Sequence, residues 1–259
     1  MNMSTHTTGD MMECRTTRIQ TLCVIIVILM SGTSWGLEFT LEGSLTSYTK
    51  FPPWEASENG SMKLQFRGLF PNGLLLYMDD GGRYDFFEVK LVEGVARLRL
   101  NLGGGTYVIT LGQGLDDGEW HSMELHRAST ETTFTLDSIS ETHHCSNADC
   151  QFGNASRNSD VFVGGLPIEY GARLSMLALP SVMFEPRFKG SVRNLVYTDF
   201  GGSSEYVQMI DSRGLRATDR SECDESNPCH HDGICVNTDS GTLCDCSHTD
   251  YIGKQCDTD

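Results

Sequence analysis

The sequence has little positive charge. Its 259 residues include 19 lysines and arginines against 35 aspartates and glutamates, so the formal net charge at pH 7 is -16. The basic residues form no cluster, which argues against nucleic acid as a partner and disfavours heparin-like glycans, because both are bound by basic surfaces. An acidic surface suits divalent cations and basic protein partners, and it also keeps a protein soluble.

Sequence signals of common catalytic sites are also missing. The chain contains neither a Gly-x-Ser-x-Gly turn nor a His-Glu-x-x-His pair. Gly103-Gly104-Gly105 lies between two predicted strands without the Lys-Ser/Thr pair or the helix of a phosphate-binding loop, so it is interpreted as a hairpin connection. We predict that the chain is not an enzyme.

No hydrophobic run is long enough to span a membrane, and the longest run lies near the N-terminus. Two arginines precede nine apolar residues at 22–30, and Ser34 and Gly36 occupy the small-residue positions of a cleavage site. A spanning helix needs about 20 apolar residues, so a retained signal anchor is the less favoured alternative. We predict a signal peptide at 1–36 and an extracellular product, secreted as given or held at the cell surface if it is part of a longer anchored protein.

Short strand-like runs dominate residues 37–216, and no stretch of twelve residues has a helical period. The pairs Asn72-Gly73 and Glu93-Gly94 predict hairpin turns. Runs with alternating or β-prone residues predict strands at 62–66, 73–78, 85–92, 95–102, 106–111, 120–126, 132–136, 161–163 and 191–197. The predicted fold class is therefore all-β, an antiparallel jelly-roll β-sandwich followed by a small disulfide-rich module.

Cysteines crowd into the C-terminal block. Eight of the ten follow the predicted signal peptide, an even number that fits an oxidising compartment, and six of these lie between Cys223 and Cys256. A block this short cannot bury enough apolar surface to fold alone, so covalent bonds must stabilise it. A zinc knuckle is disfavoured because the Cys-x-x-Cys spacing is absent. Cys145 and Cys150 are expected to bond to each other.

The spacing of the six cysteines resembles that of EGF-like domains, with one residue between the fourth and fifth and an aromatic and a glycine before the sixth. Calcium binding by this module is disfavoured, because residues 219–223 depart from the Asp-x-Asp/Asn-Glu-Cys pattern and Thr242 stands where an aromatic is expected. The resemblance implies the pairs Cys223 with Cys235, Cys229 with Cys244, and Cys246 with Cys256.

Three earlier segments resemble laminin G domains, also called LNS domains. Residues 117–127 are similar to the Asp-Gly-x-Trp-His signature, and residues 162–167 and 188–195 are similar to two further blocks in the right order. Within the signature, Trp120 is interpreted as a core anchor and His121 as a hydrogen-bonded edge residue.

The N-terminal segments narrow the resemblance further. Residues 37–39, 51–54, 73–80 and 85–88, together with the EGF-like module, are most similar to the N-terminal end of an α-neurexin. The chain is identified as a member of the neurexin family, of invertebrate type, as a fragment or short form. The predicted organisation is a signal peptide at 1–36, a laminin-G-like domain at 37–216, a linker at 217–222, an EGF-like domain at 223–256 and a tail at 257–259.

The resemblance implies one candidate metal site. Several laminin G domains hold Ca²⁺ at the sandwich rim with one aspartate and two backbone carbonyls. Asp85 stands where the family has that aspartate, and the first carbonyl would be that of Leu102. The third contribution falls on Asn154 or Ser156. So few protein ligands imply weak binding, on the order of 10⁻⁴ to 10⁻³ M.

An alternative leaves this rim without a metal, as an exposed hairpin in which Asp79, Asp80 and Asp85 are only solvated. Asn59 and Asn154 begin sequons and are predicted N-glycosylation sites, which would place both on the surface. A glycan at Asn154 would crowd the rim.

The resemblance implies a cell-adhesion and recognition module in synapse organisation. Its partners would be extracellular proteins bound in trans through the rim of the sandwich, with the EGF-like module as a stiff spacer. The alternative is a structural or glycan-binding component of the extracellular matrix, and low basic content disfavours the glycan-binding form. A third interpretation, carriage of a small hydrophobic ligand, would need an open sandwich interior.

Overall fold

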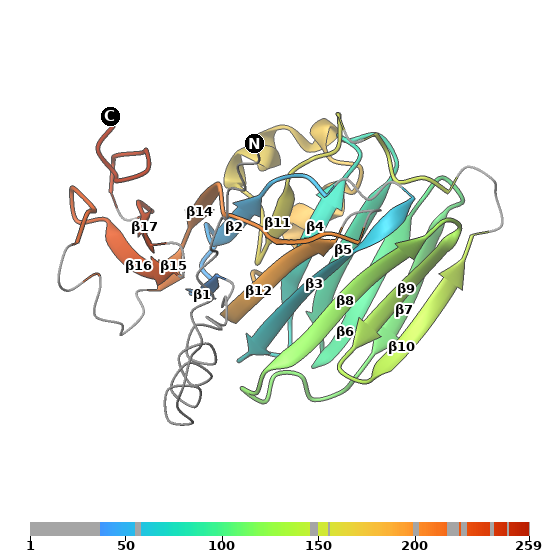
Figure 1. The fold of residues 1–259 in the computed structure, drawn as a ribbon. Helices are drawn as coiled ribbons and strands as arrows, with labels where there is room; N and C mark the ends of the chain where they lie inside the picture. Colours follow the sequence, from blue (N-terminus) through green and yellow to red (C-terminus); the bar gives the residue numbers. More distant parts are fainter. Residues whose placement is uncertain are drawn as a thin grey trace, which may run out of the picture. The chain divides into compact units, whose positions relative to one another are not determined.

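The chain folds into two facing antiparallel sheets and a separate two-stranded hairpin (Figure 1). The computed structural model describes residues 37–54, 58–145, 150–154, 156–198, 202–216, 223, 227–238, 241–247 and 249–258. The predicted signal peptide and the predicted linker lie outside the described residues. The all-β fold class is confirmed.

The first sheet has eight strands in the order β10-β9-β8-β3-β12-β1-β15, with β13 paired to β12. The second sheet has seven, in the order β14-β2-β11-β4-β5-β6-β7. The strands are β1 (Glu38–Leu41), β2 (Tyr48–Phe51), β3 (Asn59–Gly68), β4 (Gly73–Asp79), β5 (Phe86–Val92), β6 (Val95–Asn101), β7 (Thr106–Leu111), β8 (His121–Ala128), β9 (Glu131–Leu136), β10 (Ile139–His144), β11 (Val161–Val163), β12 (Gly190–Thr198), β13 (Ser204–Tyr206), β14 (Asp211–Arg213) and β15 (Leu215–Arg216).

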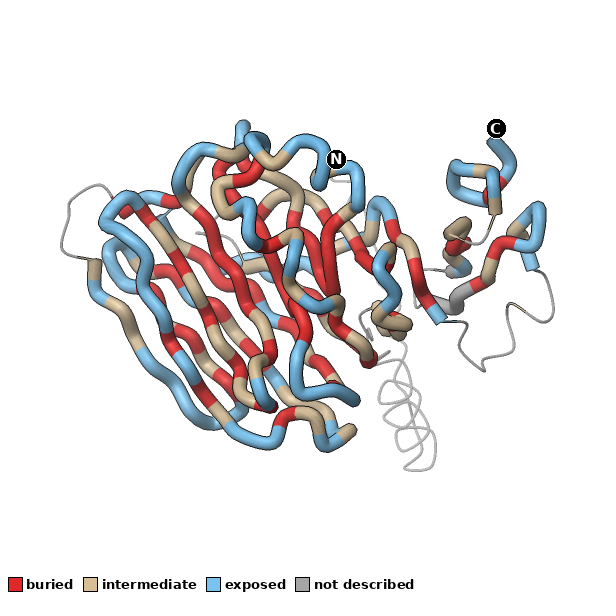
Figure 2. Tube along the Cα trace, turned by 180° about the vertical axis from the view of Figure 1, so that it is seen from behind, coloured by how far each residue is buried: buried red, intermediate tan, exposed pale blue. Residues whose placement is uncertain are grey.

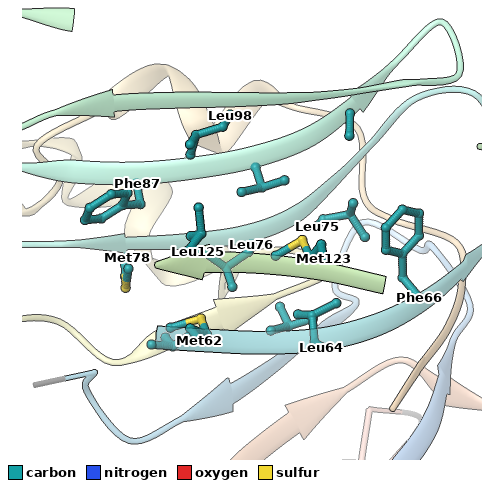
Figure 3. Close-up of a cluster of buried hydrophobic side chains, with 14 of the residues drawn as sticks. Met62, Leu64, Phe66, Leu75, Leu76, Met78, Phe87, Leu98, Met123 and Leu125 are labelled. Atoms are coloured by element: carbon teal, nitrogen blue, oxygen red, sulfur yellow. The ribbon is translucent and has the colours of Figure 1, made fainter. Parts of the chain in front are cut away.

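Alternation along the strands builds the core between the sheets. In β3, Met62, Leu64 and Phe66 are buried, while the intervening Lys63 is exposed. These side chains lie in one cluster with Leu75 of β4 and with residues of the other strands (Figure 3). Each fully buried side chain of this size stabilises the fold by about 1.5–3 kcal/mol. The sandwich is therefore a rigid platform for its connecting loops.

The second sheet is also covered on its outer side, where a second cluster joins Leu74, Tyr77 and Phe162 to Leu177 and Val182. Consequently every residue of β4 is buried (Figure 2). The covering segment contains three 3-10 helices, η1 (Ile168–Ala172), η2 (Leu174–Met176) and η3 (Pro180–Phe184). It anchors the loop that follows β4, as described below.

The nine predicted strands all correspond to strands of the sandwich. Glu93 and Gly94 have φ angles of 52° and 74° and close the β5–β6 hairpin, as expected for a two-residue turn. The hairpin predicted at Asn72-Gly73 is wrong, because the segment after β3 crosses to the other sheet. Gly73 is required there for space, since a Cβ would lie 2.8 Å from Phe188 Cα.

Trp120 is not part of the buried core, so its interpretation as a core anchor is wrong. Met123 and Leu125 of β8 point inward, and alternation then assigns Trp120 to the outer face of the sheet. Two guanidinium groups lie close to its ring, with the Cζ of Arg67 at 5.0 Å and that of Arg193 at 4.0 Å from the ring centre. His121 is hydrogen-bonded, as expected.

The C-terminal hairpin consists of β16 (Ile234–Thr238) and β17 (Gly241–Asp245). Disulfides join Cys145 to Cys150, Cys223 to Cys235, Cys229 to Cys244, and Cys246 to Cys256. The last three are the pairs implied by the resemblance to EGF-like domains. They link segments that a block of this size could not hold by packing alone.

Candidate functional site

Asp85 lies at one end of the sandwich, just before β5. The last paired residues of the β5–β6 ladder are Phe86 and Asn101, so one step further along the two strands brings Asp85 opposite Leu102. Leu102 itself is buried, which leaves only its backbone as a candidate ligand. The structure therefore brings together the two positions that the resemblance selects.

The Asp85 carboxylate joins three loops. Its Oδ2 accepts a hydrogen bond of 3.0 Å from the N–H of Gly153, and the N–H of Gly103 is close enough to act on the pKa of the carboxylate. Burial raises the pKa of Asp85 above its usual range, although the N–H of Gly153 and the charge of Arg127 oppose this. Asp85 is thus a half-buried charge that holds the glycine-rich connection and the loop after Cys150 against its own loop.

The two preceding aspartates are structural, which contradicts the interpretation of all three as solvated. Asp79 is buried and accepts hydrogen bonds from Tyr77 Oη at 2.7 Å, from the N–H of Gly81 and from that of Ala178. Asp80 accepts the N–H of Arg83 at 2.8 Å. These bonds fix the loop between β4 and β5 and tie it to the segment that covers the second sheet.

Residues 153, 154 and 156–158 lie on the facing side of the pocket, where Gly153, Asn154 and Arg157 line it. Asn154 lines the pocket, whereas the Ser156 hydroxyl donates to Asn154 Oδ1 at 2.8 Å. Of the two residues predicted for the third contribution, the structure therefore brings Asn154 to the site. Asn154 is exposed, and Asn59 is partly buried at the start of β3, where its Oδ1 accepts the N–H of Ser129. Glycosylation at both positions remains a prediction.

These loops enclose a pocket of about 600 Å³. Asp80, Arg83, Tyr84, Asp85, Asn101, Gly103, Gly105, Gly153, Asn154 and Arg157 line it. We call it the rim pocket. A Cβ on Gly105 would meet open space, so this wall leaves the mouth of the pocket unobstructed.

Arg127 of β8 supports the rim pocket from the interior and is 1 % exposed. Its guanidinium donates to Thr132 Oγ1 at 2.7 Å, to the carbonyl oxygen of Ser129 and to that of Cys150. Burial lowers the pKa of Arg127, and the charge of Asp85 opposes this. The bond from the buried Arg127 to the Cys150 carbonyl thus links the core to the loop that carries Gly153.

Sequence reasoning missed Arg83, Arg157 and Arg127. Arg83 and Arg157 belong to loops without a recognisable motif. Arg127 is the last residue of the laminin G signature at 117–127, which gives it no separate role. Sequence reasoning also assigned the glycines at 103–105 to a hairpin connection, which they form, without recognising that Gly103 and Gly105 line a pocket.

The described residues contain no cluster of three histidine, cysteine, aspartate or glutamate side chains suited to a metal. Within the same ranges, no helix is long and apolar enough to cross a membrane.

Family models match both parts of the chain. A laminin G domain model matches residues 66–199, and an EGF-like domain model matches residues 223–255. The fold is similar to that of mouse laminin α1 domains LG4-5, with a TM-score of 0.55, 17 % identity, and coverage of 70 % of this chain and 46 % of that one. These findings define a laminin G domain followed in sequence by an EGF-like module.

The chain belongs to the neurexin family. It is 41 % identical to Neurexin 1 of Drosophila melanogaster over 258 residues, which is 90 % of this chain and 14 % of that protein. It is 33 % identical to Neurexin-3a of Danio rerio over 233 residues, which is 90 % of this chain and 13 % of that protein. The chain therefore spans a small part of the length of these relatives. The laminin G, EGF-like and neurexin families consist of non-enzymatic adhesion modules.

Proposed function

We propose that this chain binds extracellular protein ligands through the rim pocket, in trans between cells and in the organisation of synapses. One observation carries the proposal. Three loops from distant parts of the sequence meet at Asp85 and enclose a pocket of about 600 Å³ on a rigid sandwich. Loops held by a rigid scaffold are the usual place for a recognition surface.

Calcium at this rim is the second part of the proposal. Laminin G domains of this family generally bind the ion. The Asp85 carboxylate and the Leu102 carbonyl are adjacent in register and offer the hard oxygen atoms that Ca²⁺ prefers. The donor set is small, and Arg83 and Arg157 bring positive charge to the same pocket. We therefore expect weak binding, with a Kd on the order of 10⁻⁴ to 10⁻³ M.

Calorimetric titration tests the calcium proposal directly. The wild-type chain should release or absorb heat as Ca²⁺ is added, and Asp85→Ala should lose that signal. Identical heats from the two proteins would contradict the assignment.

The ligand-binding proposal is tested by capture from neuronal membrane extracts, followed by mass spectrometry, with and without chelator. Wild type and Lys63→Ala, a control on the exposed outer face of β3, should capture the same proteins. Asp85→Ala should lose them. Equal capture by all three proteins would refute binding at the rim, and chelator sensitivity reports whether calcium takes part.

A further inference from the structure

Among the described residues, two arginine side chains of the rim pocket form no contact that stabilises the fold. Arg83 and Arg157 lie on opposite loops, both are exposed, and both line the pocket. Neither guanidinium has a hydrogen bond or an ion pair with any described residue, although their backbone N–H groups are bonded to Asp80 and Asn154. Unlike Arg127, these arginines contribute nothing visible to the stability of the sandwich.

Many of the acceptors of the pocket, by contrast, already hold the loops together. Asp85 accepts an N–H group of another loop, and Asp80 accepts those of Arg83 and Tyr84. The amide oxygens are used as well: Asn101 Oδ1 accepts the N–H of Gly105, and Asn154 Oδ1 accepts both the N–H and the hydroxyl of Ser156. The groups that remain for a ligand are therefore mostly donors, namely two guanidinium groups and two side-chain amide NH₂ groups.

The charges that line the pocket limit the chemical class of ligand that it can bind. Two arginines and two aspartates line the pocket, and the charge of Arg127 also acts on Asp85. A densely charged polyanion such as a sulfated glycan would be repelled by Asp80 and Asp85. A single carboxylate fits the planar forks of the arginines, which bind it bidentately.

We propose that the rim pocket recognises a single acidic side chain of a protein partner, held between Arg83 and Arg157. This inference rests on the proposed function of the rim pocket and names the chemistry of what it binds. It requires no metal ion, because the arginines supply the positive charge that calcium would otherwise supply.

The test uses residues 37–259 labelled with ¹⁵N and two short probes, acetyl-Gly-Glu-Gly-amide and its glutamine counterpart. The glutamate peptide should shift the side-chain Nε–H signals of Arg83 and Arg157 in the presence of chelator, and the glutamine peptide should not. Loss of one charge-assisted hydrogen-bonding partner should weaken binding about tenfold, so Arg83→Gln and Arg157→Gln should each have this effect.

Arg173→Gln is the matched control, since Arg173 is exposed and does not line the pocket. It should leave the titration unchanged, and all variants should keep the wild-type unfolding temperature. Equal shifts from both peptides, or none from either, would overturn the inference. A heparin-derived oligosaccharide that binds at lower concentration than the peptide would also overturn it, in favour of a polyanion site.

The two proposals fail in different ways. If Asp85→Ala captures every partner that wild type captures, the rim is not the recognition surface, whatever the peptide does. If Asp85→Ala loses its partners but the two glutamine variants keep theirs, the rim is the surface and the role of the arginines is wrong.

Discussion

Replacing Arg127 by methionine tests how the core positions the rim pocket. Methionine keeps much of the buried length of arginine but removes the charge and every donor. The carbonyl oxygens of Ser129 and Cys150 would lose a donor, and Asp85 would lose its nearby positive charge. The Thr132 hydroxyl can rotate toward another partner, and the Ser129 carbonyl is only partly buried, so the main loss is the buried bond to the Cys150 carbonyl.

The magnitude follows from these losses. A buried carbonyl that loses its donor costs about 1–3 kcal/mol. Removing the guanidinium also relieves its own desolvation cost, so we expect a net destabilisation of about 2 kcal/mol. For a domain of this size, such a loss lowers the unfolding temperature by roughly 5 °C.

Urea unfolding measures the effect. Arg127→Met should lower the urea concentration at the midpoint of unfolding without changing the slope of the free energy against urea. Arg127→Lys keeps the charge but reaches fewer acceptors, so its midpoint should lie between those of wild type and Arg127→Met. The double variant Arg127→Met with Asp85→Asn should lose less free energy of unfolding than the two single variants lose together. The difference should be about 1 kcal/mol, because the two charges interact. A midpoint for Arg127→Met within error of wild type would refute the role of Arg127 as a buried support.

Three further predictions concern other contacts. Burial acts to lower the pKa of His121, but hydrogen bonds to Asp137 at 2.9 Å and to Asp117 outweigh it and raise the pKa. The stability that His121 contributes is therefore fully present below the pKa that His121 has in the unfolded chain, and it is lost as pH rises through the higher pKa of the folded protein. Urea midpoints measured from pH 5 to 9 should fall across this range, and His121→Gln should abolish that fall. Trp120→Ala removes a ring that contacts two guanidinium groups, and thermal unfolding should show a loss of about 2–3 kcal/mol; no change would mean that these contacts contribute nothing to stability. Converting Cys145 and Cys150 to serine should leave global unfolding nearly unchanged but speed amide exchange at Gly153, because the bond closes only a small ring.

Much of the fold could be predicted because alternation and turn residues determine it locally. The Asn72-Gly73 turn shows the limit, since the same glycine serves a turn or a close approach, and only the position of Phe188 distinguishes them. Trp120 shows a second limit, because a large aromatic ring can be covered by arginine side chains as well as by a core.

The candidate site was only partly predictable. Resemblance selected Asp85 and Leu102, and the strand register brings them together. The sequence could not identify Arg83 and Arg157 as pocket residues. They line the same pocket only because two loops that are distant in sequence pack against each other. Long-range loop packing leaves no periodic signal in the sequence.

The central claim is that the rim pocket is the surface that binds a protein partner. Hydrogen–deuterium exchange of the chain alone and with a captured partner tests it most directly. Binding at the rim pocket should slow exchange at residues 80–85, 101–105 and 153–158 and leave the outer face of the first sheet unchanged. Protection on that outer face, around Arg67, Trp120 and Arg193, with no change at the rim, would show that the partner binds elsewhere.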